Sequence, residues 1–258
     1  MPIRSIMRSF AHRNFRLFFL GQGISLIGTL MQGTALPWLV LERTHSKEWL
    51  GWVAFVGQFP SVFAAPLAGV AADYFRKRNL LLVTQALAMI QAFILAALTL
   101  TNQIQMWQIL LLNGVLGIVN GFDLTTRQSF LYEMVDDKED LGNAIALNSS
   151  IFNMARLIGP AIAGQVIAAL GAGECFLLNA FSFLAVLVAL LGMRVSAESP
   201  RPTNSHLWQQ LREGMQFTLE SFPIRSLFLL VALISFFGVP YIVLIPVYVQ
   251  DVLHAGVR

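Results

Sequence analysis

The chain has 258 residues, of which 56% are hydrophobic and only 12% are charged, and its mean hydropathy is +0.67. Soluble domains carry about 25% charged residues, so this composition excludes a disordered chain and argues against a soluble enzyme or nucleic-acid-binding protein. The net charge of +3 comes from basic residues in loops between apolar runs, a pattern typical of membrane proteins. The single cysteine, Cys175, cannot form an internal disulfide, and the sequence predicts no metal site and no cofactor.

Seven stretches of the chain are long and apolar enough to cross a bilayer as helices, which takes about 20 residues. They are 17–41, 49–72, two within 79–122, 141–173, 175–193 and 226–250. The charge-free run 79–122 is too long for one crossing, and its polar patch at 101–105 divides it into two. The stretches do not alternate apolar and polar residues, as strands of a membrane barrel do. We therefore predict an all-α membrane protein with seven transmembrane helices.

The basic residues are unequally divided between the two sets of loops that these spans create. The set that includes the N-terminus holds 13 Lys and Arg residues, whereas the other set holds Arg43 and Lys47, with Arg258 at the chain end. Cytoplasmic loops of membrane proteins carry the excess of basic residues. The sequence therefore predicts a cytoplasmic N-terminus.

The loop between the second and third predicted spans combines a glycine, an acid and a basic cluster. Small residues allow helices to approach closely, but a basic turn also occurs in any cytoplasmic loop. The segment resembles the loop motif of the major facilitator superfamily, which usually has a basic residue where Tyr74 stands and a glycine where Arg76 stands. The matching positions are Gly69, Asp73, Lys77 and Arg78.

A second motif closes the fourth predicted span. Asp123 and Arg127 are four residues apart, so they can pair on one helix face. The segment also resembles one in the bacterial exporter branch that includes the enterobactin exporter and macrolide-efflux-like proteins, which often has proline where Thr125 stands. The resemblance implies that Asp123 meets Lys77 and Arg78. Together with Gly69, Asp73 and Arg127, these residues would form a conformational switch.

The fifth predicted span contains Gly159, Pro160 and Gly164. Gly159, Ala163 and Gly164 give a small face for a tight helix crossing, and Pro160 favours a kink. The arrangement resembles the fifth-helix motif of proton-coupled exporters, in which it is associated with export rather than uptake.

The same span holds one charge, Arg156, whose placement at mid-membrane costs roughly 2.5–3.5 kcal/mol. Arg156 either snorkels to the cytoplasmic edge or lines a cavity, where it would hold an anionic substrate group or tune a proton-carrying acid. The other candidate cavity residues are polar side chains within apolar spans, which could instead form hydrogen bonds between helices. They are Gln22, Ser25, Gln32 and Asn113.

The resemblance implies a major-facilitator-type helical bundle in which six spans form one half, built from two inverted three-helix units. We expect this half at 1–193, a cytoplasmic linker at 194–225 and the start of a second half at 226–258, so the chain looks truncated. The implied function is secondary active transport across the bacterial inner membrane, as proton-coupled export of a small amphipathic compound such as a siderophore or a drug-like molecule. The alternative is a truncated membrane protein that transports nothing. The expected partners are the lipid bilayer, the small-molecule substrate and the proton, and no nucleic acid is expected. The sequence predicts no enzymatic activity.

Overall fold

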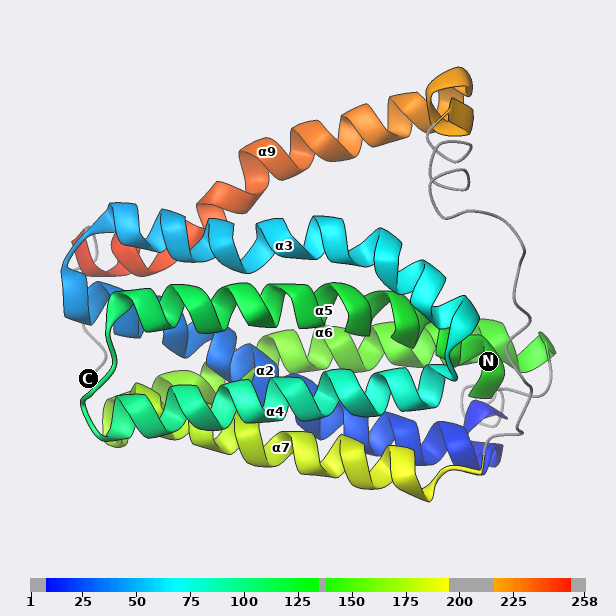
Figure 1. Cartoon of the computed structure of the whole chain (residues 1–258), viewed down its shortest axis with the longest axis horizontal. Coiled ribbons are helices and arrows are strands. Elements are labelled where there is room, and N and C mark those ends of the chain that lie inside the picture. Colours follow the sequence, from blue (N-terminus) through cyan, green and yellow to red (C-terminus); the bar gives the residue numbers. More distant parts are fainter. Residues whose placement is uncertain (1–7, 135–137, 195–215, 252–258) are drawn as a thin grey trace.

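The computed structural model describes residues 8–134, 138–194 and 216–251 (Figure 1). A short 3-10 helix, η1 (Arg8–Ala11), leads into the long helices. These are α2 (Arg13–Thr44), α3 (Lys47–Tyr74), α4 (Lys77–Leu100), α5 (Met106–Met134), α6 (Lys138–Ala169), α7 (Ala172–Gly192) and α9 (Phe222–Asp251). Helices α2 to α7 are long and apolar enough to cross a membrane, which confirms an all-α, multi-pass membrane protein.

The helices extend beyond the charge-free runs that predicted them. The fourth predicted span ends at residue 122, but α5 continues to Met134, and α6 begins at Lys138 rather than at 141. A helix can leave the apolar layer without ending, because charged side chains on its last turns reach water. Asp123 therefore lies inside α5 and not at its end.

The seventh predicted span forms the helix α9, which makes limited contact with α3 and leaves nearly all of its described side chains exposed. Its apolar part within the described side chains, Phe222–Gly238, is shorter than a membrane span. As a transmembrane helix it stays a prediction. Most of the predicted linker, at 195–215, lies outside the described residues.

The most extensive helix contacts relate the first three long helices to the next three. They join α3 with α5, α2 with α6, α2 with α7, α4 with α5 and α4 with α7. If α2 is exchanged with α5, α3 with α6 and α4 with α7, this set of contacts maps onto itself. The pattern is that of two equivalent three-helix units, and their inverted arrangement stays a prediction.

Glycines form close crossings in two equivalent helix pairs, α3 with α5 and α2 with α6. A Cβ on Gly117 of α5 would lie 2.3 Å from the carbonyl oxygen of Gly57 in α3. A Cβ on Gly159 of α6 would lie 2.8 Å from the Cβ of Leu30 in α2. In a membrane, where lipid is as apolar as leucine, helix association depends on such close packing of small residues.

Two apolar clusters fill the bundle. One includes Phe15, Phe130 and Met134 and lies toward the end of the bundle where α2 begins. This end also carries the basic residues 76–78, and we call it the basic end. The other includes Leu39 and Phe176 and lies toward the opposite end. The clusters bury α2, α4 and α7 more than the other helices, whereas α3 and α6 have the fewest buried residues.

Candidate functional site

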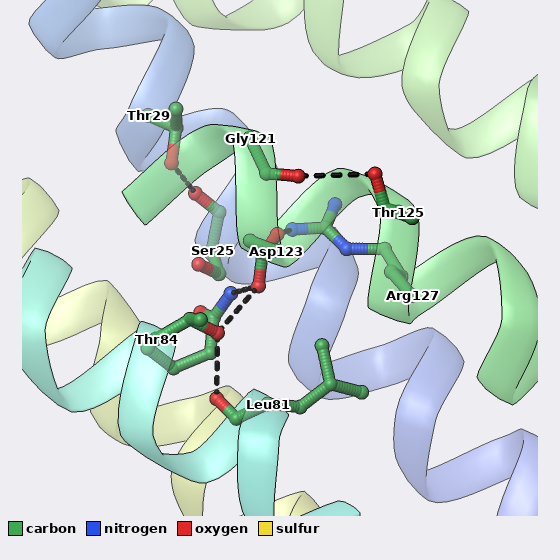
Figure 2. A network of polar contacts seen from close by, with 9 residues as sticks. Ser25, Thr29, Leu81, Thr84, Gly121, Asp123, Thr125 and Arg127 are labelled. Atoms are coloured by element: carbon green, nitrogen blue, oxygen red, sulfur yellow. Dashed lines mark hydrogen bonds and ion pairs between the residues drawn. The ribbon is translucent and has the colours of Figure 1, made fainter. Parts of the chain in front are cut away.

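Asp123 is the centre of a buried polar group between α4 and α5. Its side chain is almost fully buried, and its Oδ2 forms an ion pair with the guanidinium of Arg127 one turn later. Its Oδ1 accepts a hydrogen bond of 2.6 Å from Nε2 of Gln85 and lies 3.1 Å from the hydroxyl of Thr84. Figure 2 shows Asp123 between Thr84 and Arg127. The carboxylate is thus held by both helices, and the local pair with Arg127 is confirmed.

Lys77 and Arg78 bind other groups. Nζ of Lys77 is 2.6 Å from Oε1 of Glu133, near the end of α5. Arg78 donates from Nε to the carbonyl of Leu190 at 2.6 Å and from Nη2 to that of Leu191 at 2.9 Å. These carbonyls belong to the last turn of α7, where no later N–H of the helix is available to donate to them. Arg78 therefore caps α7.

The implied contact of Asp123 with Lys77 and Arg78 does not occur in this structure. The reason is depth along the helices. Glu133, the partner of Lys77, lies ten residues after Asp123, which is about 15 Å along α5. The prediction assumed that α5 ends beside Asp123, whereas the longer helix places this acid nearly three turns from Glu133, the residue that Lys77 reaches.

The two remaining residues of the loop motif, Asp73 and Gly69, make no ion pair and no close helix contact with the described residues. Asp73 is exposed and forms no ion pair with any residue that the structure describes. A Cβ on Gly69 would meet nothing within 4 Å, so the close helix approach expected there is not formed by the described residues. The switch role of these residues stays a prediction.

A second polar network joins three helices at the middle of the bundle. Gln32 of α2 donates from Nε2 to Oε1 of Gln91 in α4 at 3.2 Å. Its Oε1 accepts a hydrogen bond of 2.8 Å from Nδ2 of Asn179 in α7. Asn179 in turn contacts the hydroxyl of Ser182, and all four side chains are buried. The sequence analysis missed Gln91 and Asn179, although amides inside otherwise apolar runs were the available signal.

Most of the predicted cavity residues are buried or hydrogen-bonded inside the bundle. Gln32 belongs to the network above, and Nδ2 of Asn113 donates to the carbonyl of Val53 in α3 at 2.7 Å. Gln22 and Ser25 are buried in α2. These positions agree with the alternative of interhelical contacts, and Arg156 is the one member of the set with an exposed side chain. Their contact with substrate stays a prediction.

The fifth-helix motif divides between two faces of α6. Gly159 is buried at the crossing with α2, and Ala155 and Ala163, one turn to either side, are buried with it. Pro160 is exposed, and a Cβ on Gly164 would meet nothing within 4 Å. Of the predicted small face, Gly159 and Ala163 are buried together with Ala155, whereas Gly164 is not. Helix α6 continues as one helix through Pro160.

Helix α3 carries a row of exposed aromatic rings. Phe55 and Phe59 stack with 4.8 Å between their ring centres, and Phe59 meets Phe63 edge to face at 5.0 Å. Trp52 extends the row by one turn. Their spacing of three or four residues places these rings on one face of the helix.

Comparison with known proteins identifies the family. A family model described as "transmembrane secretion effector" matches residues 4–258. The chain belongs to this family. Its members are transporters of the major facilitator type, so the resemblance read from the loop motifs is confirmed.

Several curated proteins are similar to this transmembrane secretion effector chain. The staphyloferrin A transporter of Staphylococcus aureus is 31% identical over 239 residues, which cover 92% of this chain and 57% of that protein. The multidrug efflux pump Tap of Mycolicibacterium fortuitum is 26% identical over 80% of this chain and 51% of its own length. The enterobactin exporter EntS of Shigella boydii is 25% identical over 87% and 53%. The chain thus spans about half the length of the curated relatives it matches.

Proposed function

We propose that this chain forms the first half of a secondary transporter that exports a small amphipathic compound from a bacterial cell. The observation that carries the proposal is the pairing of two equivalent three-helix units with α3 and α6 exposed. Secondary transporters work by rocking two such halves about a site near the bilayer midplane. An exposed pair of helices on one half is the surface that such rocking needs.

The substrate class follows from the relatives and from the surface of α3. The relatives carry the names of a staphyloferrin A transporter and of a multidrug efflux pump, which are both transporters of small molecules. The aromatic row Trp52, Phe55, Phe59 and Phe63 offers an apolar contact surface. We propose that the compound is amphipathic and lies between α3, α6 and the remainder of the transporter.

We further propose that export is coupled to protons and that the N-terminus is cytoplasmic in the inner membrane. Residues Arg76, Lys77, Arg78 and Arg194 gather at one end of the bundle, as the positive-inside rule requires of the cytoplasmic end. The Gly159–Pro160 segment resembles the motif of proton-coupled exporters. The sequence contains no phosphate-binding loop that would bind ATP.

The test is transport by the protein expressed from its whole gene in inverted membrane vesicles. An imposed proton gradient should drive uptake of an amphipathic fluorescent dye, and a protonophore should abolish it. Vesicles without the protein are the control. Dye uptake equal to that control, from protein shown to be folded by a sharp thermal transition, would favour the non-transporting alternative.

A further inference from the structure

One charged side chain lies exposed halfway along α6. Arg156 is 13 residues from Asn143, which binds η1 at the basic end, and 13 residues from Ala169, where α6 ends. Both separations are about 20 Å at 1.5 Å per residue. The register with α2 agrees, because the neighbouring Gly159 crosses α2 beside Leu30, near the middle of that helix.

Snorkelling does not bring this guanidinium to water. Its Cζ lies 4.9 Å from the ring centre of Phe152, one turn toward the basic end. That displacement is about 5 Å along the axis and leaves most of the 20 Å to the end of the apolar layer. Ionisable residues at this depth face a bundle interior or a water-filled cavity, and they pair with one another or with backbone carbonyls.

The described residues supply no acid for this pairing. In α2 to α7 the charged residues lie in the first or last turn of a helix, apart from Arg156 itself and the mutually paired Asp123 and Arg127. In the described segment 216–251, the acids Glu220 and Asp251 lie on either side of the apolar stretch. An anion that neutralises Arg156 would therefore come from outside the described chain.

The face of α6 around Arg156 is polar. Ser149, Asn153, Arg156 and Pro160 follow each other at steps of four, three and four residues, and all are exposed. This spacing places them on one side of the helix, away from the small face that packs on α2. Because Pro160 has no N–H, it also leaves the carbonyl of Arg156 without its helical partner. The face thus offers a cation, an amide and a free carbonyl at mid-depth, and a hydroxyl about 10 Å nearer the basic end.

We propose that Arg156 binds the anionic group of the transported compound, which is then an amphipathic carboxylate or sulfonate. The inference rests on the proposed function, because it assigns the substrate class of that transporter. The planar guanidinium can bind two oxygens of such a group at once, and the ring of Phe152 beneath it fixes its orientation. Asn153, one turn away on the same face, supplies a further hydrogen bond. An anion of this kind also neutralises Arg156 within the apolar layer.

The test uses two probes that differ by one charged group. 8-Anilino-1-naphthalenesulfonate is the anion, and N-phenyl-1-naphthylamine is the same ring system without the sulfonate. Their binding is measured by fluorescence with the protein from its whole gene in nanodiscs, as wild type, Arg156→Gln and Arg156→Lys. Arg43→Gln is the matched control, since Arg43 is an exposed arginine at the end of α2 that binds Asn102.

Arg156→Gln should weaken binding of the anionic probe at least about tenfold and change binding of the neutral probe less than twofold. Arg156→Lys should retain part of the anion affinity, because it keeps the charge but loses the fork geometry. Arg43→Gln should match wild type. Anion affinity that is unchanged in Arg156→Gln would overturn the inference. Equal weakening of both probes would also overturn it, as expected if Arg156 pairs with an acid elsewhere in the protein.

Transport of the two probes separates this inference from the proposed function. Loss of anion transport in Arg156→Gln, with transport of the neutral probe retained, supports both. If the Arg156→Gln variant transports both probes at wild-type rates, the anion site is rejected and the proposed function stands. If wild-type protein binds the anion through Arg156 but moves neither probe, the anion site stands and the proposed function fails.

Discussion

Asp123 and Arg127 form an ion pair one turn apart inside α5, and the other oxygen of Asp123 is bound from α4 by Gln85. The pair is therefore more than a local helix contact, because it also fastens two helices of different three-helix units. Both side chains are largely removed from solvent. Lys77 and Glu133 form a second link between the same helices, but at the exposed basic end.

Asp123→Asn should be strongly destabilising, because it leaves the charge of Arg127 buried without a partner. Breaking one side of a buried pair costs about 3–5 kcal/mol. Thermal unfolding in detergent, followed by circular dichroism, measures this loss. The double variant Asp123→Asn with Arg127→Gln should recover much of it, since neither charge remains. No recovery would show that the bonds to α4, rather than the pair, carry the stability.

Lys77→Gln should change stability little, because its partner Glu133 is 42% exposed. Exposed ion pairs contribute about 0.2–1 kcal/mol and are screened by salt. The same unfolding measurement at low and high salt checks this difference. A salt-independent loss as large as that of Asp123→Asn would contradict the assignment of the two pairs to different depths.

Gln32→Leu should destabilise the bundle by about 1–2 kcal/mol, because it removes the partner of both Gln91 and Asn179. The readout is the thermal midpoint of the purified protein. Asn120→Ala is the matched control, since Asn120 is an exposed amide in α5 with no hydrogen bond to described residues. If both variants shifted the midpoint equally, the network would have no special part in holding α2, α4 and α7 together.

Gly117→Ala should weaken the contact between α3 and α5. Its new Cβ would lie 2.3 Å from the carbonyl oxygen of Gly57, so the helices must separate, at a cost of about 1–3 kcal/mol. Gly33→Ala is the control, because a Cβ there meets nothing within 4 Å and alanine favours the helix. We expect Gly33→Ala to be neutral or slightly stabilising. Similar losses from both substitutions would argue against a close crossing at Gly117.

Ser9→Ala should loosen the start of α6. The hydroxyl of Ser9 is 2.8 Å from Oδ1 of Asn143 and 3.0 Å from the carbonyl of Asp140, and it is fully buried. Its loss should cost about 0.5–1.5 kcal/mol and speed amide hydrogen exchange in the first turns of α6. Ser150→Ala, which removes a bond to Ala146 within α6 alone, should leave exchange there unchanged.

The sequence predicted the fold class and the membrane character because both depend on summed properties. Long apolar runs separated by charged loops leave helices in a bilayer as the stable solution, whatever their packing. The family followed from short motifs at Gly69–Arg78 and Gly159–Gly164. Such a resemblance depends on the residue types in the motif and not on the contacts that these residues make. The local pair of Asp123 and Arg127 was also predictable, since helix geometry alone brings residues four apart together.

Only the tertiary structure decided what the polar residues bind. Apolar runs mark where a helix meets lipid and not where it ends, so the extra turns of α5 separated Asp123 from Lys77. The partners of Gln32 lie 59 and 147 residues away in the chain, and no local pattern specifies such contacts. The sequence by itself placed one charge in the fifth span. The packing of Gly159 on α2 is what leaves Arg156 exposed at mid-depth, because burial depends on which face of the helix its neighbours cover.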